Sequence, residues 1–285
     1  MIPRAVAVDL GGTRLRVAWV AGKGQTREWK QTAVPPSDLP KTLGRFWKKK
    51  KWGPMHRLIV GSKGIWTEPE RQALQHVLRA LAETVTVMSD VELALHTAFV
   101  RTPLINRILI VAGTGSIALG ADKNGSLYRA GGLGPAKGDE GSGYWIGKEF
   151  LRIKRAHRGV PQVLSPQTVK KTAARAKKVI AQARHNAQCA AIVRSAQSHL
   201  ADLIVDVHRQ LGGRKPVWVS WAGSLMADKR FRTGVRAFAR SQAPGPQRWV
   251  APSDSPAQAA VVDPDAIPLK TRRSNPPRAV RKRIV

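Results

Sequence analysis

Cysteine is almost absent from this sequence, which contains only Cys189 among its 285 residues. One cysteine cannot close an intrachain disulfide, and it cannot by itself supply the ligands of a metal cluster. Long apolar runs are absent too, since no stretch approaches the roughly 18 consecutive apolar residues of a membrane-spanning helix. The first residues pass directly into a strand-like pattern without the features of a secretory signal. We therefore expect a cytoplasmic protein.

Acidic residues are scarce, because 18 Asp and Glu stand against 49 Lys and Arg and give a formal net charge of +31. Such a charge attracts polyanions, including nucleic acids. The basic residues gather at 48–51, 170–184 and 270–283, and no recognisable base-reading module accompanies them. We interpret most of this charge as solvated surface, and non-specific polyanion binding stays open.

The length and the apolar content of 42% fit two domains. Alternating and β-branched patterns predict strands at 4–10, 14–20, 25–33, 57–60, 84–88, 107–112, 117–121 and 217–221. Helical spacing predicts helices at 37–51, 68–82, 91–100, from 144 onward, and at 166–182, 187–211, 225–240 and 256–262. A strand-turn-strand pattern occurs twice, which predicts domains at 1–100 and 101–262. Proline and basic residues predict a flexible or extended tail at 263–285.

Each of the two strand-turn-strand segments has a turn that combines glycine with hydroxyl side chains. The first turn contains Gly11, Gly12 and Thr13, and it follows Asp9. The second turn contains Gly113, Thr114, Gly115 and Ser116. Glycines let backbone amides approach phosphate closely, and an acid such as Asp9 could hold hydrated magnesium. A plain hairpin turn is the alternative for either one alone, but the shared setting of the pair favours a phosphate site.

Three further acids are candidates for chemistry. Asp90 follows a predicted strand at the start of a helix, where it could be the helix N-cap or a general base, and the sequence alone favours the cap. Asp139 and Glu140 lie among glycines, where carboxylates could accept hydrogen bonds from sugar hydroxyls. Their alternative role is an acidic first turn of the following helix, which the helix dipole favours.

Five segments carry these features, in the order VAVDLGGTRLRVAWV, MSDVELALHTA, ILIVAGTGSIALGAD, GGLGPAKGDEGSGYWIGKEFL and VWVSWAGSL. They resemble the signature segments of the N-acetylglucosamine kinase and BadF/BadG ATPase branch of the actin-like sugar kinases. The resemblance extends over about residues 5–262, and GDEGSGYWIG is its most specific part. It implies an α/β fold of two actin-like, ribonuclease H-like domains, each with a mixed five-stranded sheet and helices, around an ATP cleft.

The resemblance also implies an ATP-dependent kinase that phosphorylates a hydroxyl of a hexose or amino sugar, of the N-acetylglucosamine or glucosamine type. ATP and Mg²⁺ are then the cofactors, with Asp9 as the magnesium-associated acid and Asp90 as the catalytic base. The other implied site residues are Gly11, Gly12, Thr13, Gly113, Thr114, Gly115 and Ser116 for phosphate, Gly223 and Ser224 for adenosine, and Asp139, Glu140, Gly132 and Gly134 for sugar.

Two segments depart from the family pattern. Many of these amino-sugar kinases have an Asn-containing loop after the first hairpin, where this sequence reads TAVPPSDLPKTL, and AGS replaces the commoner glycine pair near Gly223. Two other functions therefore stay open. One is an ATPase that activates a partner enzyme, although such activators use cysteine ligands for an iron–sulfur cluster and this chain has only Cys189. The other is a non-catalytic relative that binds sugar or nucleic acid. The sequence also leaves a homodimer open.

Overall fold

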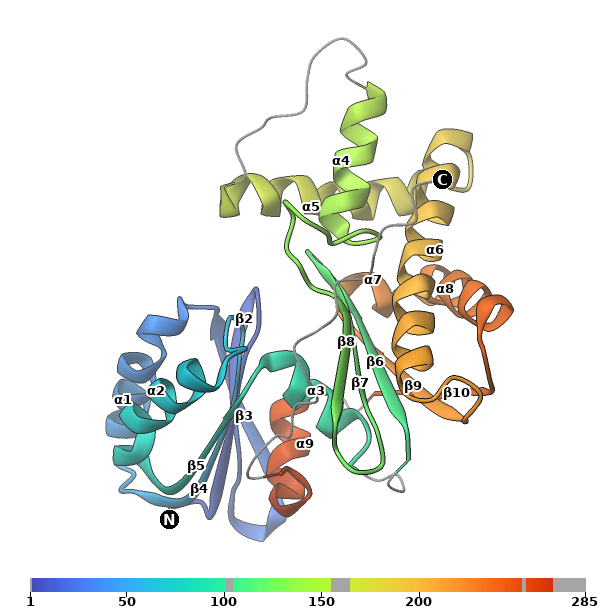
Figure 1. The fold of residues 1–285 in the computed structure, drawn as a ribbon. Coiled ribbons are helices and arrows are strands. Elements are labelled where there is room, and N and C mark those ends of the chain that lie inside the picture. The colour runs from blue at the N-terminus through green and yellow to red at the C-terminus, as the bar shows by residue number, and fades with distance from the viewer. Residues whose placement is uncertain (1, 101–104, 155–164, 253–254, 269–285) are drawn as a thin grey trace. The chain divides into compact units, whose positions relative to one another are not determined.

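The computed structural model describes residues 2–100, 105–154, 165–252 and 255–268. Contacts divide the chain into two compact units, one of Met1–Thr102 and Pro252–Thr271 and the other of Pro103–Ala251 and Arg272–Val285. Each unit contains one five-stranded sheet (Figure 1). Most of the predicted tail, residues 269–285, lies outside the described residues.

The sheet of the first unit has the strand order β3-β2-β1-β4-β5. Its strands are β1 (Ala5–Leu10), β2 (Arg14–Val20), β3 (Thr26–Thr32), β4 (Met55–Ser62) and β5 (Ala82–Met88). β1, β2 and β3 pair antiparallel, whereas β4 pairs parallel with both β1 and β5, so the sheet is mixed. Every residue of the central strand β1 is buried, as expected for a strand covered on both faces.

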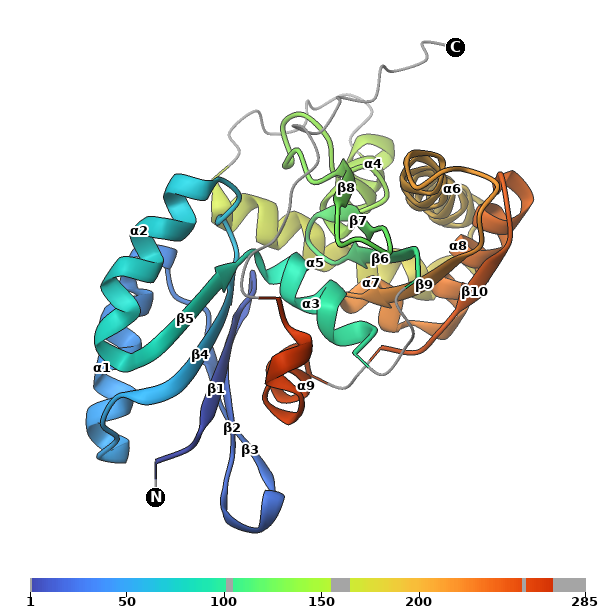
Figure 2. The ribbon, with the colours of Figure 1, turned by 60° about the horizontal axis from the view of Figure 1, so that its bottom comes forward.

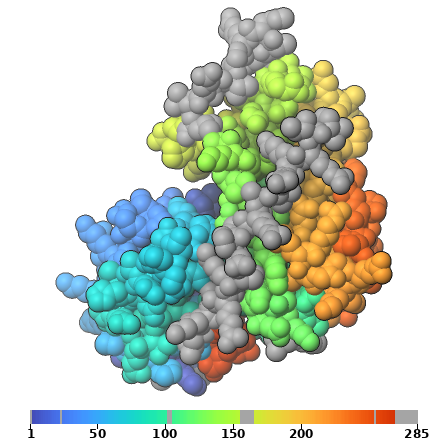
Figure 3. Space-filling view, viewed as in Figure 1, coloured from blue at the N-terminus to red at the C-terminus, as the bar shows by residue number. Residues whose placement is uncertain are grey.

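Helices cover both faces of this sheet (Figure 2). α1 (Leu39–Lys50) and α2 (Glu68–Leu78) pack on the face formed by Val6, Val8 and Leu10. α3 (Asp90–Ala98) and α9 (Pro256–Val262) pack on the opposite face. The alternation of side chains along β1 explains this division, because Ala7 points to the second group of helices. Figure 3 shows the outer side of α2 at the molecular surface.

Helix α9 belongs to the first unit, whereas the sequence analysis grouped 256–262 with the second domain. Ala257 and Ala260 are fully buried against small residues of the first sheet, and small side chains allow this close approach. Beyond α9, Arg57 on β4 donates to the Asp265 carboxylate at 2.9 Å and to the Ile267 carbonyl at 2.6 Å. The prediction of a flexible tail is therefore wrong for residues 263–268, because long-range contacts hold them.

The sheet of the second unit has the order β10-β9-β6-β7-β8, which repeats the arrangement of the first. Its strands are β6 (Arg107–Ala112), β7 (Ser116–Ala121), β8 (Leu127–Gly131), β9 (Val217–Ala222) and β10 (Gln247–Trp249). β6, β7 and β8 pair antiparallel, and β6, β9 and β10 pair parallel. The prediction of two mixed five-stranded sheets with helices is confirmed, although the patterns did not predict β8 or β10.

The helices of the second unit are α4 (Gly143–Lys154), α5 (Pro166–Gln182), α6 (Ala187–Gln210), α7 (Ser224–Ala227) and α8 (Lys229–Gln242). The single helix predicted at 225–240 is in fact α7 and α8. They are separated at Asp228, whose extended backbone starts α8 and whose carboxylate accepts the N–H of Phe231 at 2.8 Å. Across the residues that the structure describes, no helix has the length and apolar content of a membrane span.

Candidate active site

The first turn, residues 11–13, joins β1 to β2 as the predicted hairpin. Leu10 pairs with Leu15, and the Gly11 N–H donates to the Arg14 carbonyl at 3.0 Å. Gly12 and Thr13 are exposed, and a Cβ added to Gly12 would meet no atom within 4 Å. The turn therefore leaves its surface open to a ligand.

Asp9 lies just before the first turn and is only 5% exposed. Arg16 lies opposite it on β2 and donates from Nη1 to Asp9 Oδ2 at 2.8 Å. Burial raises the pKa of Asp9, and the charge and hydrogen bond of Arg16 oppose this rise. Sequence reasoning missed Arg16. The sequence could have predicted this pair, because residues at equal distances from a hairpin turn face each other across the two strands.

Asp90 is the first residue of α3 but is not its N-cap. Ser89 is the cap, since its hydroxyl accepts the Glu92 N–H at 3.2 Å, while the Glu92 carboxylate accepts the Ser89 N–H at 2.8 Å. The cap interpretation of Asp90 is therefore wrong. Its Oδ1 instead accepts the N–H of Val91 at 3.0 Å.

The pKa of Asp90 lies well above the usual value for an aspartate. Burial first, and then the negative charge of Asp9, raise the pKa of Asp90 to about 6, while the N–H of Val91 and the charge of Lys63 act in the opposite direction. The structure thus brings Asp9 and Asp90 close enough for the charge of Asp9 to raise the pKa of Asp90. A carboxyl group with such a pKa suits a general base at physiological pH.

The same pair of acids fits a hydrated divalent cation. Asp90 and Asp9 repel each other, and a cation beside Asp9 would relieve this repulsion. No group of three or more His, Cys, Asp and Glu side chains suited to a metal exists among the described residues. Magnesium would fit such a site, because it commonly keeps water ligands and takes only one or two carboxylates together with phosphate oxygens.

A buried ion pair holds the start of α3. Arg71 on α2 donates from Nη2 to both carboxylate oxygens of Glu92 at 2.7 Å, and the two side chains are 6% and 1% exposed. Glu92 also completes the capping box with Ser89. The backbone position of Asp90 is therefore tied to α2 through Glu92, a connection that sequence reasoning did not find.

The second turn, residues 113–116, is held by its own chain. The Gly113 carbonyl accepts the N–H of Gly143 at 2.7 Å, and the Thr114 carbonyl accepts that of Tyr144 at 3.2 Å. The Ser116 hydroxyl donates to the carbonyl of Glu140 at 2.8 Å. The start of α4 and the glycine-rich loop, which we define as residues 132–142, thus fix the conformation of this turn.

Asp139 belongs to this network and lies before α4, which begins at Gly143. The alternative that Asp139 is in the first turn of that helix is therefore wrong. Its carboxylate accepts the Ser116 N–H at 3.3 Å and a backbone hydrogen bond from Gly134. Burial raises the pKa of Asp139, and these two bonds lower it. A Cβ added to Gly115 would lie 2.9 Å from Asp139 Oδ2, so a side chain there would displace the Asp139 carboxylate.

The other predicted residues of the second unit lie around the same turn. The Gly132 N–H donates to the Ser116 carbonyl at 2.9 Å. Gly223, after β9, has a φ of +91°, and an added Cβ would lie 2.3 Å from the carbonyl oxygen of Ala112. Only glycine fits such a position. Ser224 begins α7 beside Gly113, since a Cβ on that glycine would be 3.9 Å from the Ser224 nitrogen.

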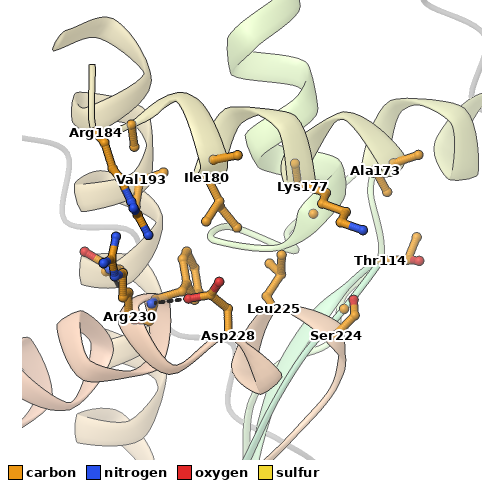
Figure 4. Close-up of a pocket in the computed structure, with 18 of the residues that line it drawn as sticks. Thr114, Ala173, Lys177, Ile180, Arg184, Val193, Ser224, Leu225, Asp228 and Arg230 are labelled. Atoms are coloured by element: carbon orange, nitrogen blue, oxygen red, sulfur yellow. Dashed lines mark hydrogen bonds between the residues drawn. The ribbon is translucent and has the colours of Figure 1, made fainter. Parts of the chain in front are cut away.

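A cavity of about 1160 Å³ opens beside the second turn, between α5 and the pair α7 and α8 (Figure 4). Thr114 and Ser224 lie at one end, and Arg184 and Arg230 at the other, with Lys177 between them. Sequence reasoning interpreted the α5 region as a solvated basic helix and so missed the cavity-lining cations. The cations on α5 and just after it line a cavity only because α7 and α8, which come much later in the sequence, form the opposite wall.

Comparisons with known proteins identify the family and the fold of this chain. A model of the BadF/BadG/BcrA/BcrD ATPase family matches residues 105–247. The N-acetylmuramic acid/N-acetylglucosamine kinase of Clostridium acetobutylicum is 34% identical over 97 residues, which cover 33% of this chain and 31% of that protein. The N-acetyl-D-glucosamine kinase of Dictyostelium discoideum is 51% identical over 45 residues, which cover 16% of this chain and 14% of that protein. The matched segments thus span less than a third of either relative.

A solved structure supports the fold. A Chromobacterium violaceum protein proposed to be an N-acetylglucosamine kinase superposes with a TM-score of 0.66 at 19% identity, covering 92% of this chain and 98% of that one. This likeness confirms the predicted two-domain architecture. The family match covers half of the chain and contains the second turn, the glycine-rich loop and the cavity. This chain belongs to the BadF/BadG/BcrA/BcrD ATPase family.

Proposed function

We propose that this chain is an ATP-dependent kinase that phosphorylates a hydroxyl of a hexose or amino sugar, of the N-acetylglucosamine or glucosamine type. The observation that carries this proposal is the pair of Asp9 and Asp90 beside the open first turn, with the pKa of Asp90 raised to about 6. Membership of an ATPase family supports ATP as the donor. Two relatives that are named N-acetylglucosamine kinases support the acceptor class.

In this proposal Asp90, when deprotonated, accepts the proton of the sugar hydroxyl as that oxygen attacks the γ-phosphorus. Arg16 holds the carboxylate of Asp9 in place through the 2.8 Å hydrogen bond. Bound Mg²⁺ beside Asp9 would supply positive charge to the phosphate oxygens. Gly11, Gly12 and Thr13 contribute backbone and hydroxyl groups to phosphate binding at the first turn.

The second unit binds the nucleotide in this scheme. Gly113, Thr114, Gly115 and Ser116 form the second phosphate turn, and Gly223 and Ser224 lie on the adenosine side. The cavity beside them is large enough for a nucleotide. We assign this activity to the cytoplasm, where ATP is made and used.

Asp139, Glu140, Gly132 and Gly134 are the proposed sugar contacts. Asp139 already accepts hydrogen bonds from Ser116 and Gly134. An ionised carboxylate has about four acceptor positions, so capacity remains for a sugar hydroxyl. The partner-activating ATPase is not favoured, because Cys189 is 2% exposed and a cluster ligand would have to reach a second chain.

The test is a coupled assay of ADP release with glucosamine, N-acetylglucosamine, N-acetylmuramic acid, N-acetylmannosamine and glucose. We expect one of the amino sugars to give ADP and sugar phosphate in equal amounts, and Asp90→Asn to lower the rate of this reaction by about 10³-fold. A folded, nucleotide-binding protein that releases no ADP with any of these sugars would contradict the proposal. Salt-sensitive RNA binding in the same preparation would then favour the non-catalytic relative.

A further inference from the structure

Glu28 on β3 is a buried acid on the same face of the first sheet as Asp9. Its side chain is only 4% exposed. Asp9 lies opposite Arg16, and Ala18, two residues further along β2, lies opposite Glu28. Because residues two apart on a strand share a face, Asp9, Arg16 and Glu28 point to the same side of the sheet. Arg16 is therefore on the strand between the two acids.

Two partners hold the Glu28 carboxylate in one place. Lys30 Nζ lies 2.7 Å from Oε2, and the Ser255 hydroxyl donates to Oε1 at 2.5 Å. The burial of a charge costs free energy unless the group is paired and hydrogen-bonded, and these partners meet both conditions. Lys30 itself is 57% exposed, so the acid is the buried member of the pair. The contacts place a fixed negative charge inside the first unit.

Ser255 comes from a distant part of the chain, 227 residues after Glu28. It is the N-cap residue of α9, a position where a serine oxygen usually accepts a backbone N–H, yet it makes no such cap. Its hydroxyl is instead directed to Glu28. α9 packs on β1, β2 and β3 (Figure 2), and Ala257 and Ala260 are buried with Ala7 on this face. The helix thus brings Ser255 to the face that contains Asp9.

The charge of Glu28 acts on Asp9. Burial first raises the pKa of Asp9, the charge and hydrogen bond of Arg16 lower it, and the negative charge of Glu28 raises it. The two neighbours therefore affect the Asp9 carboxylate in opposite directions. Arg16 cancels part of the negative charge that attracts a cation, whereas Glu28 adds to it. A cation beside Asp9 would relieve the repulsion between the two acids.

We propose that Glu28 is a positioning residue for the Mg²⁺ site: held by Ser255 and Lys30, it keeps the surroundings of Asp9 negative enough to hold a hydrated divalent cation beside Arg16. This inference rests on the proposed function, in which Asp9 is the acid of that site. Arg16 orients the Asp9 carboxylate through the 2.8 Å hydrogen bond, and Glu28 offsets the charge that Arg16 brings.

The first experiment needs no turnover. Calorimetry measures the Kd of ATP with Mg²⁺ and with EDTA, and the ratio of the two affinities reports how strongly the protein favours the metal-bound nucleotide. We expect Glu28→Gln to lower this ratio by about three- to tenfold, because one negative charge near the cation is lost. The new amide oxygen can still accept the Ser255 hydroxyl. Glu83→Gln is the control, since this acid on β5 is also in an ion pair but is 71% exposed. A parent-like ratio in Glu28→Gln would overturn the inference.

Two further variants separate charge from structure. Lys30→Met removes the counter-charge of Glu28, so we expect the ratio to rise by about twofold. Ser255→Ala keeps both charges and removes the hydrogen bond, so it should lower the urea midpoint of unfolding but change the ratio less than Glu28→Gln does. A structural role alone would lower the ratio in all three variants. A fall in Lys30→Met, or a fall in Ser255→Ala as large as that in Glu28→Gln, would overturn the charge assignment.

Turnover then distinguishes this inference from the proposed function. With the best sugar, Glu28→Gln should raise the half-saturating concentration of Mg²⁺ by about three- to tenfold and leave KM for the sugar unchanged. If the calorimetric ratio shifts as expected but no sugar is phosphorylated, the proposed function fails and the assignment of Glu28 survives. A parent protein that phosphorylates a sugar but binds ATP equally with Mg²⁺ and with EDTA would overturn the inference and leave the proposed function intact.

Discussion

The two hairpin turns share one strand arrangement but have opposite surroundings. The first turn is exposed and has two acids near it, Asp9 and Asp90, and the pKa of Asp90 is raised to about 6. The second turn is fixed by hydrogen bonds from the glycine-rich loop and from the start of α4. We propose that the repeated fold element has two roles. In this proposal the first unit supplies carboxyl groups that take part in proton transfer, and the second supplies a hydrogen-bonded turn beside a large cavity.

The strongest test of this division is Asp90→Asn. A general base contributes about 10²- to 10⁴-fold to the rate, so we expect kcat for sugar phosphorylation to fall by about 10³-fold. ATP binding should persist, because the cavity lies in the second unit. Asp38→Asn is the control, since this exposed acid also lies next to a helix start but makes no side-chain cap. Parent-like turnover in Asp90→Asn would break the comparison.

The rigidity of the second unit is tested by two glycine substitutions. Gly223→Ala places a Cβ 2.3 Å from the Ala112 carbonyl oxygen at a φ of +91°. We expect a loss of about 2–4 kcal/mol in the free energy of unfolding, measured by urea titration, and weaker ATP binding. Gly12→Ala meets no atom within 4 Å and should change stability by less than about 0.5 kcal/mol. Equal destabilisation by both substitutions would contradict the proposed difference between the open first turn and the tightly packed surroundings of the second turn.

Removal of the Arg71–Glu92 ion pair, which ties the start of α3 to α2, should lower activity less than the changes above. The double variant Arg71→Met with Glu92→Gln removes the buried ion pair without leaving one charge unpaired, and the amide oxygen of the new side chain can still accept the Ser89 N–H. We expect kcat to fall by about tenfold with KM for ATP unchanged, because a shift of about 1 Å in a catalytic group is enough for such losses. The pH midpoint of kcat/KM should also move, which a purely structural pair would not cause. Arg79→Met, at an exposed position after α2, is the control.

Local sequence patterns predicted most of the fold, because the strands of both hairpins and most helices can be recognised from the spacing of their apolar residues. β1 and β2 alternate around a glycine turn, and α6 has apolar residues at helical spacing over 24 residues. β10 has only three residues, so its pairing with β9 sets its conformation more than its own pattern does. The segment after α9 was missed because Arg57, which binds Asp265, lies 208 residues away in the sequence.

The candidate site was predictable only in part. The order of Asp9, Asp90 and the two turns is visible in the sequence, since Asp9 lies near the end of a strand and Asp90 and both turns follow strands. Arg71 was not identified, because its partner Glu92 lies on another helix and neither residue stands in a glycine motif. The burial of Asp90 and its repulsion by Asp9, which set its pKa, also depend on distances that a linear pattern does not contain.

The pH dependence of the reaction locates the titrating group in one turn or the other. Asp90 has a pKa of about 6, so the base is protonated below this pH and active above it. We expect kcat/KM to rise through a midpoint near pH 6 and to be about tenfold lower at pH 5 than at its plateau. Burial raises the pKa of Asp139 as well, but its carboxylate is bound to the backbone of the second turn. The residual activity of Asp139→Asn should therefore keep the midpoint near pH 6. Loss of that midpoint in Asp139→Asn would assign the titration to the second unit and reverse the roles of the two turns.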